Sequence, residues 1–152
     1  MIPYILPPRW IALSVVFVIV SALFPVIAAQ ADVRILSSPG GAVDAYLAAF
    51  ARVRQSGERV IIDGPCLSAC TLVLSTIPRN RICVTRRAVL GFHAPRWYYP
   101  GTGQTMRASE ATRLVTASYP PAVRAWIKRR GGLTQKVLYL RGKELTALYP
   151  RC

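Results

Sequence analysis

Beyond residue 32, the apolar positions first form a short run typical of a strand and then recur at the spacing of a helix. Residues 33–36 are short and mostly apolar, and they end at a Ser-Pro-Gly-Gly turn, which predicts a strand. From residue 43 to residue 56 apolar side chains recur at helical spacing, and Gly57 stands where a C-terminal cap is expected. A second β-prone run covers 59–62. Strand, helix and strand of these lengths form a βαβ crossover, which implies a parallel pair and an α/β sheet.

Similar short elements are predicted in the rest of the chain. A small-residue apolar run at 68–75 predicts a buried helix with Ser68 in its first turn, and 81–84 and 88–92 predict strands. His93 follows the second of these strands. Three further helices are predicted at 109–119, capped by Ser109, at 122–130 before a Gly-Gly pair, and at 143–148.

The first 31 residues differ in composition from the rest. They contain one charged residue, Arg9, a mostly apolar run from Trp10 to Ala29 and the small-x-small pattern Ala29-Gln30-Ala31, which predict a cleaved secretory signal peptide. The alternative is an uncleaved inner-membrane anchor over residues 10–27, a run that just reaches transmembrane length. Either way, residues 32–152 form one exported, periplasmic domain.

The chain is strongly basic, with 20 Lys and Arg against 6 Asp and Glu and a formal net charge of +14. This balance favours an anionic partner, and for an exported protein a phospholipid surface is favoured over nucleic acid. Because the basic residues are dispersed, a solvated basic face is the favoured explanation for them.

Cysteine usage agrees with export. Cys66, Cys70, Cys83 and Cys152 form an even set, which predicts two disulfides, and the sequence leaves all three pairings open. A metal site built from Cys66, Cys70 and His93 is the competing interpretation. It is disfavoured because no second CxxC or histidine pair supports it, so we expect neither a metal nor a cofactor.

Ser68 and His93 are the candidates for chemistry. A serine hydroxyl becomes a nucleophile when an adjacent base takes its proton, and His93 is the one histidine of the chain. Upstream, the turn at Gly40 and Gly41 offers backbone N–H groups that could hold a developing oxyanion.

Three motifs carry a resemblance to a known superfamily. The segments Ser38-Pro39-Gly40-Gly41, Gly64-x-x-x-Ser68-Ala69 and Gly91-Phe92-His93-Ala94-Pro95 occur in that order, and Ser68 and His93 are 25 positions apart. In letters, order and spacing the chain from Ile35 to Pro95 resembles the proteolytic subunit of the Clp protease and its relatives in the ClpP/crotonase superfamily. The resemblance implies an α/β fold of βαβ units with a small, mostly parallel sheet flanked by helices. The family's first strand and helix are absent here, which weighs against its ring assembly, although a homo-oligomer stays an expectation.

The resemblance also implies roles for four residues. Ser68 would be the nucleophile, His93 the general base, and Gly41 and Ala69 the oxyanion donors of a serine hydrolase acting on a peptide or small acyl substrate. The family's orienting aspartate is replaced, because the alignment of residues 139–144 puts Val137 at its position.

Two acids remain as substitutes for that aspartate, Glu144 and Glu110, although each also fits the exposed start of a helix. A Ser-Lys dyad is disfavoured because the three lysines lie on basic stretches that we expect to be exposed. The alternative to an enzyme is a catalytically inactive module of the same fold that acts in binding or assembly at an anionic membrane. Ser68 would then be a small packing residue between two cysteines, and His93 a core histidine.

Overall fold

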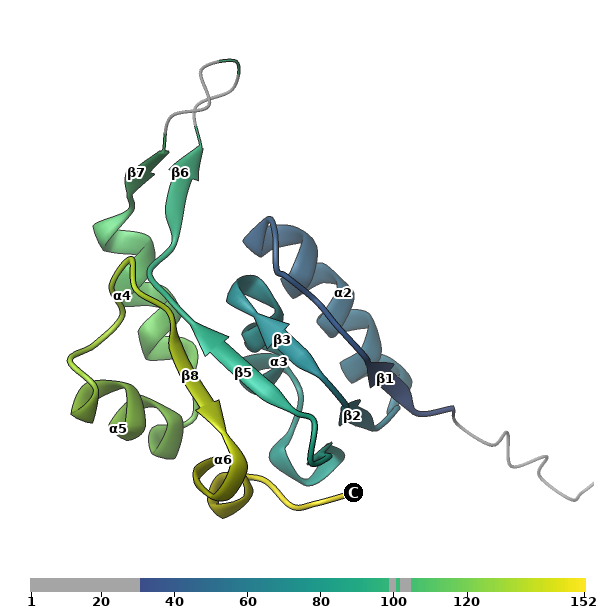
Figure 1. Ribbon diagram of the computed structural model, residues 1–152. Coiled ribbons are helices and arrows are strands. Elements are labelled where there is room, and N and C mark those ends of the chain that lie inside the picture. Colours follow the sequence, from purple (N-terminus) through teal and green to yellow (C-terminus); the bar gives the residue numbers. More distant parts are fainter. Residues whose placement is uncertain (1–30, 99–100, 102–104) are drawn as a thin grey trace, which may run out of the picture.

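The computed structural model describes residues 31–98, 101 and 105–152 (Figure 1). The predictions of a signal peptide or membrane anchor fall on residues that lie outside this part, except for Ala31. Within it, no helix has both the length and the apolar character needed to cross a membrane.

The predicted βαβ unit is present at the start of the domain. Strand β1 (Val33–Ile35) and strand β2 (Val60–Ile62) pair in parallel, and helix α2 (Val43–Ser56) connects them. Helix α2 ends at Gly57, whose φ of 81° is the left-handed conformation expected of a glycine cap. Strand β4 (Ile82–Val84) joins the other side of β2, also in parallel. β2 is therefore the central strand of a three-stranded parallel sheet, and all three of its residues are buried.

A second sheet follows where we had expected one continuous sheet. It consists of β3 (Pro65–Leu67), β5 (Val89–Phe92) and β8 (Leu138–Arg141), with β3 and β5 parallel and β8 antiparallel to β5. The chain passes from β2 to β3 through Gly64, which packs so closely on β1 that a Cβ there would lie 1.9 Å from the Leu36 carbonyl oxygen. The fold is thus mixed α/β, and the described strands form two three-stranded sheets and a separate two-stranded one rather than the single small sheet predicted.

Short helices and a hairpin complete the domain. The predicted helix at 68–75 is a 3-10 helix, η1 (Ser68–Leu72), that continues into α3 (Val73–Thr76), and the hairpin pairs β6 (Arg96–Tyr98) with β7 (Thr105–Arg107) and extends away from the sheets (Figure 1). A second short 3-10 helix, η2, spans Arg79–Arg81. The C-terminal helices are α4 (Ser109–Ser118), α5 (Pro121–Arg129) and α6 (Gly142–Leu148). Ser109 is the first helical residue of α4, so its predicted capping role is wrong: Ala108 occupies the cap and makes no side-chain capping bond.

One apolar core connects the two sheets with the C-terminal helices. Phe92 of β5 packs edge-on against Tyr119, with ring centroids 5.3 Å apart, and lies 5.8 Å from the Trp126 ring of α5. The side chains of Leu140 and Leu145 are fully buried beside them. This packing fixes the end of β5 where His93 begins.

The four cysteines form the disulfides Cys66–Cys70 and Cys83–Cys152. The second bond ties the C-terminal residue to β4, where Val84 N–H also donates to the Pro150 carbonyl at 2.9 Å. With both thiols of Cys66 and Cys70 in a disulfide, neither is a metal ligand, and the described residues hold no cluster suited to a metal ion.

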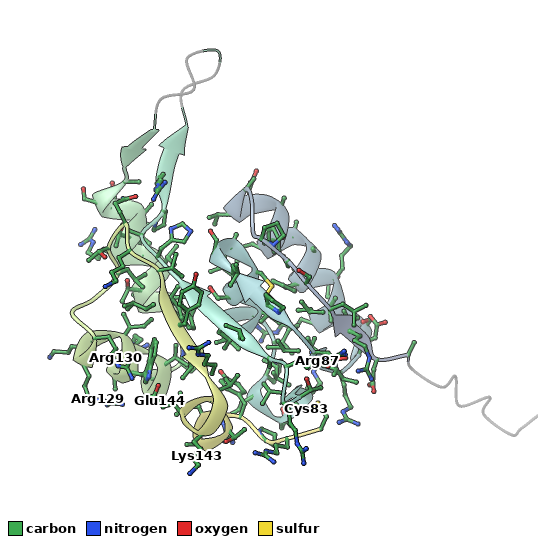
Figure 2. The ribbon with its side chains drawn as sticks, viewed as in Figure 1. Cys83, Arg87, Arg129, Arg130, Lys143 and Glu144 are labelled. Carbon is green, nitrogen blue, oxygen red and sulfur yellow. A yellow bond between two sulfur atoms is a disulfide. The ribbon has the colours of Figure 1, made fainter. Side chains whose placement is uncertain are left out.

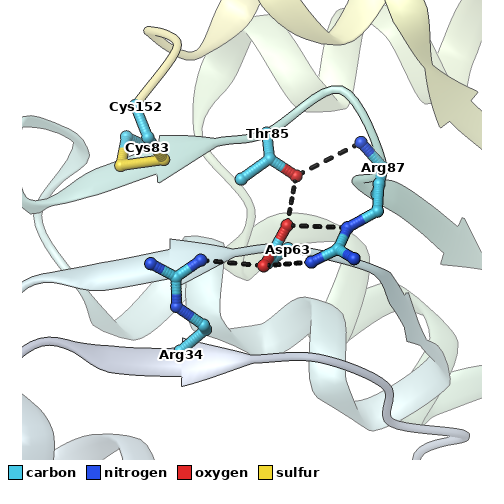
Figure 3. Close-up of polar contacts among 6 residues, drawn as sticks. All are labelled: Arg34, Asp63, Cys83, Thr85, Arg87 and Cys152. Carbon is cyan, nitrogen blue, oxygen red and sulfur yellow. Dashed lines mark hydrogen bonds and ion pairs between the residues drawn. A yellow bond between two sulfur atoms is a disulfide. The ribbon is translucent and has the colours of Figure 1, made fainter.

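Asp63 connects three segments where the first sheet passes into the second (Figure 3). This buried carboxylate accepts hydrogen bonds from Arg87 at 2.5 and 3.1 Å, from the Thr85 hydroxyl at 2.7 Å and from Arg34 at 2.8 Å. The hydrogen bonds from Arg87 have the largest effect on the pKa of Asp63. Together with those from Thr85 and Arg34 they hold this pKa well below its usual value. The ion cluster joins β1, the end of β2 and the turn that leads to β5.

We predict that the two disulfides contribute unequally to stability. Closing a loop restricts the unfolded chain more when the loop is longer, so Cys83→Ala/Cys152→Ala, which opens a loop with a sequence separation of 69, should lower the free energy of unfolding by about 4 kcal/mol. Cys66→Ala/Cys70→Ala, with a separation of 4, should cost about 2 kcal/mol. Urea denaturation measures both, and an equal loss would contradict the chain-entropy argument.

We predict that acid destabilises the domain through Asp63. Because the folded pKa is lowered, the ionised carboxylate contributes stability that is complete above its unfolded pKa, near 3.8, and is lost as the pH falls below that value. Urea unfolding between about pH 6 and pH 2 should show a steep loss below about pH 4. Asp63→Asn should be less stable at neutral pH and show a flatter acid limb, whereas the exposed Asp32→Asn should behave like the wild type.

Candidate active site

Ser68 lies at the junction of β3 and η1 in a strained conformation. Its φ is 54°, which makes it the one non-glycine residue with positive φ in the described part of the chain. A left-handed serine is energetically unfavourable, and such residues persist where the surrounding structure holds them, often at functional sites. The sequence predicted a helix start at Ser68 but not this backbone conformation.

Three contacts surround the Ser68 backbone. Gly40, with φ of 87°, packs so closely that a Cβ there would lie 2.5 Å from the Ser68 Cβ and 3.0 Å from the Ala69 nitrogen. The Thr71 hydroxyl donates to the Ser68 carbonyl at 2.6 Å, and the Cys66–Cys70 disulfide encloses the residue. The Ser-Pro-Gly-Gly turn therefore lies directly against the candidate nucleophile.

The predicted oxyanion donors lie beside it. Gly41 and Ala69 line the same pocket as Ser68 and His93, and this pocket has a volume of about 240 Å³. Ala69 is the second residue of η1, and N–H groups in the first turn of a helix have no acceptor inside that helix. The structure thus brings all four residues predicted from sequence to one place.

His93 follows β5 and is half-buried in this pocket. Its Nδ1 lies 2.8 Å from the carbonyl oxygen of Ala94. Because a carbonyl oxygen only accepts, we assign the ring proton to Nδ1, which leaves Nε2 as the unprotonated nitrogen. That tautomer is the one a general base requires. Both residues lie in the part of the chain that the structure describes, and no hydrogen bond joins Ser68 to His93 there.

The candidate orienting acids lie elsewhere. Glu144 pairs with Arg130 at 2.5 Å, at the start of α6. Since Arg141, the residue before α6, pairs with Val89 at the beginning of β5, Glu144 lies at the opposite end of this strand from His93. Glu110 is exposed on the first turn of α4, 3.9 Å from Arg113. Neither carboxylate has a hydrogen bond to His93 among the described residues.

Val137 lies beside the end of β5, next to Gly91. The antiparallel register ends where Phe92 pairs with Leu138, so His93 and Val137 are the next residues on the two segments. Ala94 N–H donates to the Thr134 carbonyl at 2.7 Å, so the paired register does not continue past this point. The Val137 Cγ1 lies 3.2 Å from the position that a Cβ on Gly91 would occupy, on the face that His93 shares. The residue that the alignment puts at the aspartate position is therefore apolar and lies beside the end of β5.

A larger apolar cleft of about 690 Å³ adjoins the pocket and runs between α2 and α4. The cleft and the pocket share Val43, Leu72 and Val115 on their walls. Leu47 of α2 and Leu114 of α4 line the cleft and are 41% and 60% exposed. An aliphatic group could therefore bind here next to Ser68.

Tyr119 is a pocket residue that the sequence reasoning did not single out. Its hydroxyl lies 2.6 Å from the Thr71 hydroxyl, which in turn donates to the Ser68 carbonyl. Burial raises the pKa of Tyr119 to about 12, although the Thr71 hydrogen bond lowers it. Tyr119 is therefore protonated at neutral pH, and it supports the backbone of Ser68 through Thr71. No local pattern marks such a residue, because its partner is 48 positions away.

The lysines and most of the C-terminal basic residues lie away from the pocket. No lysine is among the described residues that line it. Figure 2 shows Arg129 at the end of α5, Arg130 directly after it, and Lys143 and Glu144 on α6, and Arg130 pairs with Glu144. Arg130 also stacks over the Trp126 ring, with its guanidinium carbon 5.0 Å from the ring centroid.

Comparison with known proteins gives no further assignment: no family model matches the chain, and no curated protein is significantly similar to it.

Proposed function

We propose that residues 32–152 form an exported serine hydrolase of the ClpP/crotonase-like type. The observation that carries the proposal is the shared pocket, in which a strained Ser68, His93 with Nε2 unprotonated and the backbone of Gly41 and Ala69 meet. The proposed substrate is a peptide or small acyl compound. The apolar cleft beside the pocket favours a substrate that carries an aliphatic group on the acyl side of the bond to be cleaved.

The proposed reaction follows from these positions. Nε2 of His93 takes the hydroxyl proton while Ser68 Oγ attacks the carbonyl carbon, and the Gly41 and Ala69 N–H groups stabilise the oxyanion. The protonated His93 then gives its proton to the leaving group. Water repeats the sequence on the acyl-enzyme and releases the acid.

The Ala94 carbonyl takes over part of the missing aspartate's role in this proposal. By accepting from Nδ1–H it keeps His93 in the base tautomer. A neutral carbonyl stabilises the imidazolium less than a carboxylate does, because hydrogen bonds to charged acceptors are about twice as strong. The enzyme is therefore expected to be slow.

The competing proposal is a catalytically inactive domain that binds an anionic membrane surface. The basic side chains of α5 and α6 (Figure 2) and the formal charge of +14 support it. Reactivity of Ser68 separates the two proposals.

We predict that a fluorophosphonate probe labels the oxidised protein at Ser68. Ser68→Ala should abolish labelling, and His93→Ala should slow it by roughly 100- to 10,000-fold because the base is lost. Ser75→Ala is the matched control, since Ser75 pairs with Ser118 at 3.0 Å outside the pocket. Absence of labelling in wild-type protein with both disulfides formed would refute the hydrolase proposal.

We predict that Val137→Asp increases the labelling rate. A carboxylate at position 137 that accepts from Nδ1–H in place of the Ala94 carbonyl would stabilise the imidazolium with a full charge, so the rate should rise at least about 10-fold. Val137→Asn is the control of similar size without the charge. A rate that does not rise, or that rises equally in both variants, would contradict the assignment of position 137.

A further inference from the structure

We propose that the Cys66–Cys70 disulfide is a positioning element that holds Ser68 in its left-handed conformation. The bond closes a short loop that contains Leu67, Ser68 and Ala69, so the strained residue stands at the centre of the loop. The effect on labelling rests on the proposed hydrolase function, whereas the effect on backbone conformation does not.

The ends of this loop are fixed to different elements. Cys66 lies in β3, pairs with Leu90 of β5 and forms a bridge with Ser38. Cys70 lies in η1 and is buried in the core. Since the two anchors belong to a strand and to a helix, the bond fixes the bend between them, and Ser68 is the residue that makes this bend.

The other contacts do not fix the bend covalently. Gly40 makes room for Ser68 but forms no bond to it, and the Thr71 hydroxyl holds only the Ser68 carbonyl. A serine released from constraint favours negative φ, because positive φ brings its Cβ into conflict with the backbone. Without the disulfide we therefore expect residue 68 to relax, and its Oγ to leave the pocket.

The burial of Cys66 and Cys70 indicates that their disulfide holds Ser68 permanently and is not a redox switch. Cys66 and Cys70 are 0% and 1% exposed, so a reductant has no access to their sulfurs in the folded protein. Cys152 of the other disulfide is exposed. The Cys66–Cys70 bond thus acts as a permanent part of the site.

A thermal-melting cycle tests the conformational claim without any need for activity. Ser68→Gly and Ser68→Ala are compared with the Cys66–Cys70 bond present and in a Cys66→Ala/Cys70→Ala background. Glycine tolerates positive φ and alanine does not. The melting temperature of Ser68→Gly minus that of Ser68→Ala should therefore be about 3 °C higher when the bond is present than when it is absent. Because the bond also restricts residue 68 in the unfolded chain, the cycle is paired with the three-bond HN–Hα coupling of residue 68, which reports φ in the folded protein directly and should change when the bond is removed.

Labelling of the otherwise wild-type site tests the functional claim. Cys66→Ala/Cys70→Ala should lower the fluorophosphonate labelling rate at least about 10-fold while its melting temperature falls modestly. The matched control, Cys83→Ala/Cys152→Ala, should lose more melting temperature and keep its labelling rate. If the Cys66–Cys70 bond only stabilised the fold, the labelling rate would fall most in the variant with the lowest melting temperature, which is Cys83→Ala/Cys152→Ala. The proposal predicts that it falls most in Cys66→Ala/Cys70→Ala.

Each outcome decides the proposal. A Gly-to-Ala difference that is the same in both backgrounds, or a labelling rate that Cys66→Ala/Cys70→Ala leaves unchanged, would overturn it. If the wild type is never labelled, the hydrolase proposal fails, and the melting cycle with the coupling of residue 68 decides the positioning claim. If the double alanine variant does not fold, Cys66→Val/Cys70→Ala fills the buried site and takes its place in both experiments.

Discussion

The structure depends on the close packing of the Ser-Pro-Gly-Gly turn against the bend at residue 68. Ser38 N–H donates to the Pro65 carbonyl at 2.8 Å, and Leu67 N–H donates to the Ser38 carbonyl at 2.9 Å. Gly40 then approaches Ser68 at a distance that excludes any side chain. This contact joins the segment after β1 to β3, and so it sets how the two sheets meet and where Gly41 lies relative to Ser68.

Sequence periodicity was sufficient for elements whose signal is local. Helix α2 has the predicted bounds because fourteen residues give the helical repeat room to appear. The strands β3 and β8 were missed because three or four residues show no clear alternation, and their partners in β5 are distant in the chain. The division into two sheets depends on Gly64 passing Leu36, a tertiary contact that no local pattern records. The same holds for the choice among three disulfide pairings.

The sequence was sufficient to select the residues of the candidate site, but not to predict the backbone geometry around them. Motif spacing was enough to select Ser68 and His93, which share a pocket with Gly41 and Ala69. The positive φ of Ser68 could not be foreseen, because serine rarely adopts it and the cause lies in the surrounding contacts. The Ala94 carbonyl was missed because every residue has a carbonyl, and only the fold decides which one a histidine meets.

A carbonyl in place of a carboxylate would change what the proposed hydrolase site can do. Tautomer control requires only an acceptor at Nδ1, and the Ala94 oxygen supplies one at 2.8 Å. Stabilising the imidazolium requires negative charge, and position 137, where the resemblance puts the aspartate, carries a valine. Loss of the orienting aspartate in a serine protease costs about 10,000-fold in rate largely because the tautomer is wrong. Since His93 keeps the right tautomer, we expect a smaller loss here, so the absence of an aspartate does not by itself make Ser68 inert.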